Sequence, residues 1–381
     1  MIKKYFLPFV CFLILIVSLH DIKVIPFYKE PGLDFSNNYG FHHCEPGPLS
    51  IYKIDPSKCA DFEARPYVYP PLLYQLFSWT RMFDSSASAY WFFIFLHLAS
   101  FLLVVYIWTE KNLLSLLFGL GLFFTYPNLF LFERGNSDML IVLFWSLSYL
   151  AYKKNQYNLT GFLLAVSLFS KLYPIYSVLI LFAFFYDKTN ERNQILKSSI
   201  LTGLGIFLIS PFLWIEYVFT VLPAWSGIKL PIFNLAHSFK SIPGSGIGTI
   251  VFALVLLFWI VAARKSSRQR LGWIWAGGLA ISTFNNGVSY DYNLVTIFPL
   301  AMLGFNQLTR ESNNKFLALS FIVLFFTVFG FRDILSHFSV YPLARLWLIA
   351  LSLLIIPFVL FDLSSEKRRM VYFFKTLRFN H

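Results

Sequence analysis

Charged residues are scarce in this chain of 381 residues. Asp, Glu, Lys and Arg make up 13% of the sequence, whereas a soluble domain carries about 25%. Hydrophobic residues make up 57% and aromatic residues 20%. A soluble domain is therefore excluded, and the composition predicts an all-α polytopic membrane protein.

Several catalytic motifs are also missing. The sequence has no HExxH, no CxxC pair, no GxSxG, no Walker lysine loop and no GxGxxG, so zinc proteolysis, redox catalysis, triad hydrolysis and nucleotide binding have no support. The His42-His43 pair with Glu45 has no spacing specific for a metal. We therefore expect no metal site and no cofactor, although the sequence does not decide whether a divalent metal is required.

Cysteine is rare, with three residues in all. Cys11 lies in the first apolar segment, where it is expected to pack without reacting. Cys44 and Cys59 share a segment that we place outside the cell, where oxidation favours disulfides. A Cys44–Cys59 disulfide is therefore a candidate, and the sequence leaves it open.

The apolar segments predict about 12 transmembrane helices (roughly 10–13), because a helix needs about 20 residues to cross the bilayer core. Lys171 and Pro174 interrupt the segment Gly161–Tyr186, which predicts two short helices there rather than one span. The other predicted spans are Tyr5–Leu19, Ala87–Trp108, Leu113–Phe132, Met139–Tyr152, Ile195–Ile215, Ile247–Ala263, Leu271–Val288, Tyr292–Leu308, Phe316–Gly330 and Leu346–Phe361.

The charges sort to two sides in this topology. The inner segments hold 19 basic and 6 acidic residues and the outer segments 12 and 13, so that the net charge of +12 comes from one side. This positive-inside pattern predicts that both termini are cytoplasmic. Nucleic acid is a poor partner, because the basic residues lie in short separate loops. We expect a multi-pass protein of the plasma membrane, the inner membrane of a bacterium, with membrane lipids around it.

Residues 1–381 are predicted to form a single integral membrane domain. Residues 20–86 are the first extracytoplasmic loop, and eight of the eighteen prolines lie between Pro26 and Pro71, which favours short interfacial helices over one long helix. Residues 216–246 form a second extracytoplasmic loop and residues 362–381 a basic cytoplasmic tail. Function is expected between the two outer loops.

Asp34 is the first candidate for catalysis. It follows the first span and could act as a general base for an acceptor hydroxyl, although a solvated loop aspartate or a helix N-cap is the ordinary explanation for such a residue. Asp55, Asp61 and Glu63 are alternative bases. Arg65, just before a Tyr-Pro-Pro turn at Tyr69, could hold a phosphate through two hydrogen bonds.

Polar residues also interrupt the turn after the third predicted span. Arg134 and Asp138 could simply pair and Asn136 could cap the next helix, but charges near membrane depth also mark substrate pathways. Lys171 either reaches up to the outer headgroups or holds a lipid-linked phosphate.

The later outer segments contribute His237, Lys240, Tyr290 and Asp291. Each has an ordinary explanation in loop solvation or capping. The topology nevertheless puts all the following residues on one membrane face: Asp34, Arg65, Arg134, Lys171, His237, Lys240, Tyr290 and Asp291.

An ordered set of motifs resembles the GT-C superfamily of membrane glycosyltransferases, and within it glycosyltransferase family 87 of the polyprenol-phosphate-mannose-dependent alpha-mannosyltransferase type. The motifs span most of the chain up to about residue 300: Asp34-Phe35, Tyr69-Pro70-Pro71-Leu72, Gly135-Asn136-Ser137-Asp138, Gly161 through Lys171 and Pro174, Asn234 through Ser238, and Ser289-Tyr290-Asp291-Tyr292.

The resemblance implies a GT-C-like fold, a polyprenyl-phosphate sugar donor, a lipid or glycan acceptor on the extracytoplasmic face, and a carboxylate base matched by Asp34. In this interpretation, the donor phosphate is bound by Arg65, Arg134, Lys171, His237 and Lys240. The substrates are further contacted by Tyr69, Asn136, Asp138, Tyr290 and Asp291.

The segment from His42 to Arg65 departs from the family pattern, which leaves Asp55 or Asp61 open as the base and makes mannose one choice among hexoses. The alternatives are a transporter or flippase of lipid-linked sugars, a polymerase or ligase of lipid-linked glycans, and a noncatalytic assembly factor. A transporter is expected to show pseudo-symmetric halves and polar residues throughout its depth, whereas the polar groups here cluster on one side.

Overall fold

The structure, a computed structural model, describes residues 32–44, 50–54, 67–109, 112–226, 247–266, 270–283 and 291–310. All secondary structure within these ranges is helical, without a strand, which agrees with the predicted all-α class. The elements are α2 (Leu33–His43), α3 (Pro71–Leu76), η2 (Ser78–Met82), α4 (Ser86–Thr109), α5 (Leu113–Gly121), η3 (Leu122–Phe124), α6 (Tyr126–Arg134), α7 (Asp138–Lys153), α8 (Tyr157–Ser170), α9 (Ile175–Phe184), α10 (Thr189–Ile209), α11 (Pro211–Glu216), η4 (Tyr217–Val221), α12 (Leu222–Ser226), α13 (Ile247–Lys265), α14 (Leu271–Thr283), η7 (Asp291–Ile297) and α15 (Phe298–Arg310).

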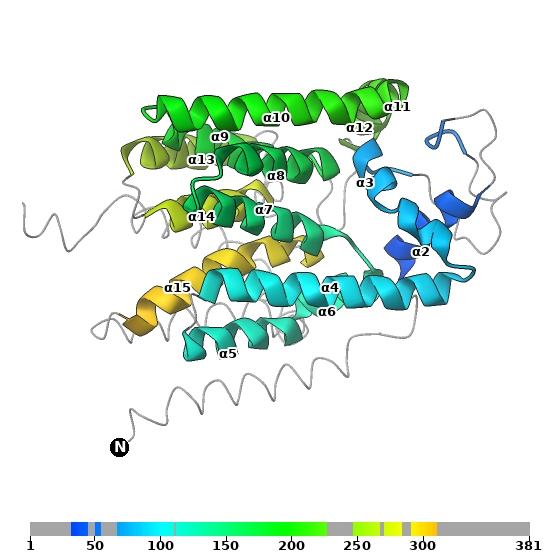
Figure 1. Ribbon diagram of the computed structural model, residues 1–381, viewed down its shortest axis with the longest axis horizontal. Coiled ribbons are helices and arrows are strands. Elements are labelled where there is room, and N and C mark those ends of the chain that lie inside the picture. Colours follow the sequence, from blue (N-terminus) through cyan, green and yellow to red (C-terminus); the bar gives the residue numbers. More distant parts are fainter. Residues whose placement is uncertain are drawn as a thin grey trace, which may run out of the picture.

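The long helices form a bundle with their axes roughly aligned, and α2 and α3 lie at one end of it (Figure 1). Helix α8 packs between α7 and α10, and α4 packs against α7.

Two described helices are long and apolar enough to cross a membrane, α4 and the part of α13 at Gly248–Lys265. The number rises to four if each of two bent helix pairs counts as one span. The total of about 12 spans stays a prediction, since the proposed spans at Tyr5–Leu19, Phe316–Gly330 and Leu346–Phe361 lie outside the described residues.

Two predicted spans are broken by proline. Leu113–Phe132 was expected to be one span, but α5 with η3 is bent by 51° relative to the part of α6 from Pro127 to Arg134. Ile195–Ile215 was also expected to be continuous, but α10 ends at Ile209 and the chain turns by 100° into the segment that begins at Pro211. Proline lacks the N–H that would continue the helix, so the chain begins a new one.

The predicted break in Gly161–Tyr186 is confirmed. Helix α8 ends at Ser170 and α9 begins at Ile175, so Lys171 and Pro174 both lie between the two helices. Lys171 thus directly follows the end of α8, where its side chain can point away from the apolar surfaces of α8 and α9.

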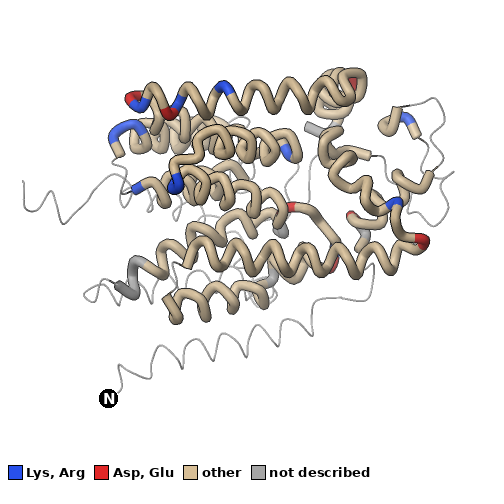
Figure 2. Tube along the Cα trace, viewed as in Figure 1, with Lys and Arg blue, Asp and Glu red and all other residues tan. Residues whose placement is uncertain are grey.

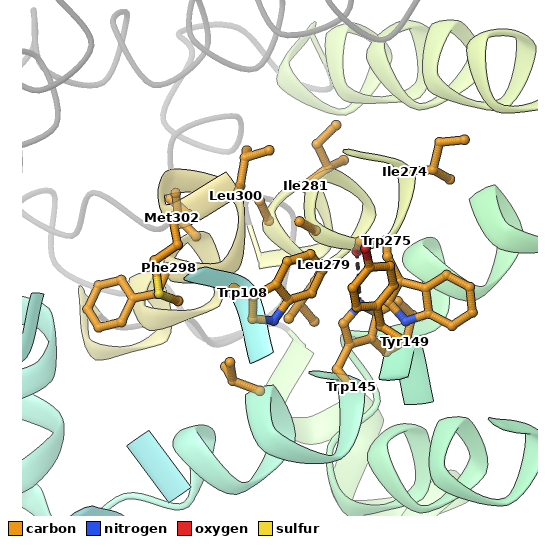
Figure 3. Close-up of a cluster of buried hydrophobic side chains, with 14 of the residues drawn as sticks. Trp108, Trp145, Tyr149, Ile274, Trp275, Leu279, Ile281, Phe298, Leu300 and Met302 are labelled. Atoms are coloured by element: carbon orange, nitrogen blue, oxygen red, sulfur yellow. Dashed lines mark hydrogen bonds between the residues drawn. The ribbon is translucent and has the colours of Figure 1, made fainter. Parts of the chain in front are cut away.

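Tryptophan and tyrosine side chains build the centre of the bundle (Figure 3). Trp108 stacks on Tyr149 with ring centroids 4.5 Å apart. The Trp145 indole N–H donates to the Trp275 carbonyl at 2.9 Å, and the Trp275 indole donates to Ser148 at 3.0 Å. Since each of these buried indoles has an acceptor, the core joins α4, α7 and α14 without leaving those donors unsatisfied.

Lys and Arg gather at the end of the bundle opposite α2 and α3, as Figure 2 shows. This end holds the last residues of α7 and α13 and the start of α10, including Lys153, Arg192, Arg264 and Lys265. The described helices thus carry the charge asymmetry expected from the sequence along the bundle axis.

Candidate functional site

Two glycines allow the start of α2 to contact the end of α6. Gly32 has a φ of +73° and its N–H donates to the Glu133 carbonyl at 2.5 Å. Gly135 ends α6 with a φ of +66°, and a Cβ there would lie 2.5 Å from Cβ of Phe35. Glycine meets both needs, the left-handed backbone and the close approach. The contact brings Asp34, in the first turn of α2, next to Arg134 at the end of α6.

The Asp34 carboxylate is held on both oxygens. Nη2 of Arg134 donates to Oδ1 at 3.1 Å, and Nδ2 of Asn136 donates to Oδ2 at 2.8 Å. The side chain is 12% exposed. Asp34 is thus neither a solvated loop residue nor the helix N-cap, which is Gly32.

Asn136 links Asp34 to the interior of the bundle. Its Oδ1 accepts from Nζ of Lys171 at 2.8 Å and from the Asp138 N–H at 3.2 Å. Its Nδ2 also lies 3.4 Å from the Tyr69 hydroxyl, and Nζ of Lys171 is 5.3 Å from the centre of the Tyr69 ring. One amide therefore contacts an anion on one side and a cation on the other.

Lys171 and Asp138 form a buried ion pair. Nζ lies 2.6 Å from Oδ1 of Asp138, and the two side chains are 10% and 0% exposed. Nδ2 of Asn293 donates to the other Asp138 oxygen, and the Tyr173 hydroxyl lies 3.5 Å from Oδ1. A buried carboxylate requires such partners, because its desolvation is costly.

The network joins residues from five separate parts of the chain: the start of α2, the segment before α3, the α6–α7 turn, the α8–α9 break and η7. Among the residues predicted from the sequence, it brings together Asp34, Tyr69, Arg134, Asn136, Asp138 and Lys171.

The other predicted residues are not placed. Arg65, His237, Lys240 and Tyr290 lie outside the described residues, and so does the side chain of Asp291. The alternative bases Asp55, Asp61 and Glu63 also lie outside them.

Two of the simpler predictions are wrong. Arg134 does not pair with Asp138, because Gly135 ends α6 and the two residues do not share a helix; Arg134 pairs with Asp34 instead. Lys171 does not extend to the headgroups, because Asp138 and Asn136 hold its ammonium inside the protein. The expected capping by Asn136 is met in part, since its Oδ1 accepts the N–H of the first residue of α7.

Asn293 is a site residue that the sequence analysis did not select. It ends the polar stretch Ser289–Asn293 and precedes the apolar run of η7, and it is 97% buried. Its signal was an amide at the edge of an apolar segment, which is weak because such residues also serve as caps.

The two histidines considered as metal ligands bind the neighbouring loop instead. Nε2 of His42 donates to the Tyr74 carbonyl at 2.7 Å, and Nε2 of His43 lies 3.1 Å from the Thr80 carbonyl. Burial lowers the pKa of His42 to about 4, against the opposing effect of the Tyr74 bond, and the positive charges of Arg81 and His43 lower it further. Within the described ranges no three His, Cys, Asp or Glu side chains come together as a metal site would require.

Cys44, directly after α2, is disulfide-bonded. Cys59 lies outside the described residues, so the Cys44–Cys59 pairing stays a prediction.

A family model described as glycosyltransferase family 87 matches residues 67–281, more than half of the chain. The chain belongs to glycosyltransferase family 87. It is therefore a glycosyltransferase, which acts on a sugar donor and an acceptor. No curated protein and no solved structure matches it.

The matched range of family 87 contains most of the network, from Tyr69 to Lys171. It does not include Asp34 or Asn293, which join the network only through the fold. Asp34 and Asn293 are thus assigned to the network by their contacts in the structure and not by the family match.

Proposed function

We propose that this glycosyltransferase transfers a hexose, with mannose as the first candidate, from a polyprenyl-phosphate donor to an acceptor hydroxyl of a lipid or glycan at the extracytoplasmic face. One observation carries the proposal: the Asp34 carboxylate is fixed between Arg134 and Asn136 at the end of the bundle that lies away from the basic cluster.

The orientation follows from the charges. Short basic segments stay in the cytoplasm, so the end with Lys153, Arg192 and Arg264 faces inward and the end with Asp34 faces outward. Nucleotide sugars are not supplied on that side. An activated sugar must then arrive on a lipid carrier, which is the physical reason for the polyprenyl-phosphate donor.

The reaction is a displacement at the anomeric carbon. The acceptor oxygen forms a bond to C1 while the bond from C1 to the phosphate oxygen breaks, and polyprenyl phosphate leaves with that electron pair. Asp34 takes the proton of the acceptor hydroxyl, a contribution typically worth about 10²–10⁴-fold in rate.

The surroundings of Asp34 suit this role geometrically. Arg134 donates to one oxygen and Asn136 to the other, which fixes the plane of the carboxylate, and each oxygen has a second lone pair with which to accept the proton of a hydroxyl. The 12% exposure of the side chain leaves an approach while most water is kept away.

Cations would stabilise the negative charge that develops on the departing phosphate. Lys171 is the weakest of the predicted ones, because Asp138 already balances its charge. Arg134 lies beside the proposed base, with its Nη2 3.1 Å from Oδ1 of Asp34, so its charge is close to the proposed site of reaction. The cations proposed for this task are therefore Arg65, Arg134, His237 and Lys240, without the Lys171 that the sequence also indicated.

The test is an incubation of the purified protein in membranes with a panel of radiolabelled polyprenyl-phosphate sugars. We expect label transfer with one donor and a loss of about 10²-fold or more in Asp34→Asn. The matched control is Asp84→Asn, because Asp84 is an exposed aspartate of the same first loop. Transfer that persists unchanged in Asp34→Asn would show that Asp34 is not the base, and no transfer with any donor would refute the substrate class.

A further inference from the structure

Asn136 has a side chain that can work in only one orientation. On one side stands the Asp34 carboxylate, which only accepts hydrogen bonds, and on the other side the Lys171 ammonium, which only donates them. The amide must therefore point Nδ2 at Asp34 and Oδ1 at Lys171. Turning it over would set like groups against each other on both sides.

The ion pair behind Asn136 keeps this arrangement in place. Asp138 holds Lys171 at 2.6 Å, and Asn293 from η7 holds the second oxygen of Asp138. The backbone N–H of Asp138 also donates to Oδ1 of Asn136 at 3.2 Å. The orientation of the amide is thus determined by buried residues and not by the substrate.

We propose that Asn136 is a positioning residue that holds the Asp34 carboxylate in its working orientation, and that Lys171 acts on Asp34 through Asn136 rather than on the donor phosphate. This inference rests on the proposed role of Asp34 as the base. The sequence indicated that Asn136 and Lys171 contact the substrates. In this proposal both residues act through contacts inside the protein instead.

The charged and polar groups around Asp34 determine what a substitution of Asn136 would do. Asp34 faces Arg134 from α6, Asn136 from the α6–α7 turn and, beyond the amide, Lys171 and Asp138. Arg134 and Asn136 both donate hydrogen bonds to this carboxylate. Exchanging the donor of Asn136 for an oxygen would oppose the charge of the carboxylate.

Asn136→Asp is the sharpest variant, because aspartate has the same shape as asparagine. The oxygen toward Lys171 is kept, and the nitrogen toward Asp34 becomes a second anionic oxygen. Two adjacent carboxylates hinder each other's ionisation. We expect the acid limb of the pH profile of kcat to move up by about one pH unit or more, with activity recovering at higher pH.

The control is Asn193→Asp, which adds the same charge at an exposed position on α10. Its pH profile should match that of the parent. The proposal would be overturned if the acid limb of the kcat profile of Asn136→Asp lay at the same pH as that of the parent, whether kcat was lowered equally at every pH or not at all.

A second variant tests the contribution of Lys171. Lys171→Met/Asp138→Asn removes both buried charges together and leaves Asn136 without its cation. We expect kcat to fall about tenfold or more, with the KM for the polyprenyl-phosphate sugar within about twofold of the parent. A rise in that KM at constant kcat would mean that Lys171 binds the donor phosphate, and unchanged kinetics would mean that it does neither; both results contradict the proposal.

The outcome for Asp34 separates the two proposals. If Asp34→Asn transfers sugar as well as the parent, the proposed base is wrong. If Asp34→Asn is inactive while Asn136→Asp keeps the acid limb of the parent, the base stands and the positioning role of Asn136 fails.

Discussion

Replacing Asp138 by asparagine should destabilise the protein far more than breaking an exposed ion pair. The substitution keeps the shape of the side chain, so it creates no cavity. It leaves the Lys171 ammonium, 10% exposed, without its carboxylate, and losing one partner of a buried pair typically costs about 3–5 kcal/mol. Asp138→Asn also sets an NH₂ group against donors, because Lys171 and Asn293 both donate to the present carboxylate.

The pair between Lys53 and Glu216 provides the comparison. Its atoms are 3.3 Å apart, but the Lys53 side chain is 64% exposed, and such pairs contribute about 0–1 kcal/mol. Glu216→Gln should therefore cost at most about 1 kcal/mol.

The assay is denaturant unfolding of the purified proteins at one detergent concentration, with the free energies of unfolding compared. The double variant Asp138→Asn/Lys171→Met should recover most of the loss, since a neutral apolar replacement of a buried pair is often tolerated. The reasoning is refuted if Asp138→Asn costs no more than Glu216→Gln, or if the double variant is less stable than Asp138→Asn alone.

The remaining predictions concern the docking of α2. Gly135→Ala should lower the free energy of unfolding by more than about 1–2 kcal/mol, because the left-handed backbone alone costs that much and the new Cβ would meet Phe35; Gly121→Ala, where a Cβ meets nothing within 4 Å, is the control in the same unfolding experiment. For His42, whose pKa falls to about 4 on folding, the unfolded state takes up the proton first. Stability should be complete above about pH 6.5 and fall by up to roughly 3 kcal/mol as the pH drops to about 4. His42→Leu should flatten that part of the stability profile measured from pH 7.5 to 4, and an unchanged slope would contradict the assignment.

The helices predicted best from the sequence are those with long apolar runs and polar ends. The prediction Ala87–Trp108 differs from α4 by one residue at each end, and Met139–Tyr152 differs from α7 in the same way. The break at Lys171 was also foreseen. The same reasoning was not applied to Pro127 and Pro211, although both break predicted spans.

The pairing of the site residues could not be predicted. Arg134 and Asp138 lie in one short polar stretch and were expected to be able to pair, but Gly135 lies in the left-handed region and separates the two helices. Asp34 and Arg134 are 100 positions apart, and no local pattern links residues at such a distance. The sequence indicated six of the residues that the network joins, whereas their hydrogen-bond partners depend on the tertiary fold.

The contact between Asn293 and Asp138 bridges 155 positions of the chain. During synthesis, Asp138 and Lys171 emerge long before the segment that completes their surroundings. The network around Asp138 is therefore completed late, after η7 has packed against α7. Nascent chains halted just before Asp291 should carry the whole matched range, residues 67–281, and yet transfer no sugar.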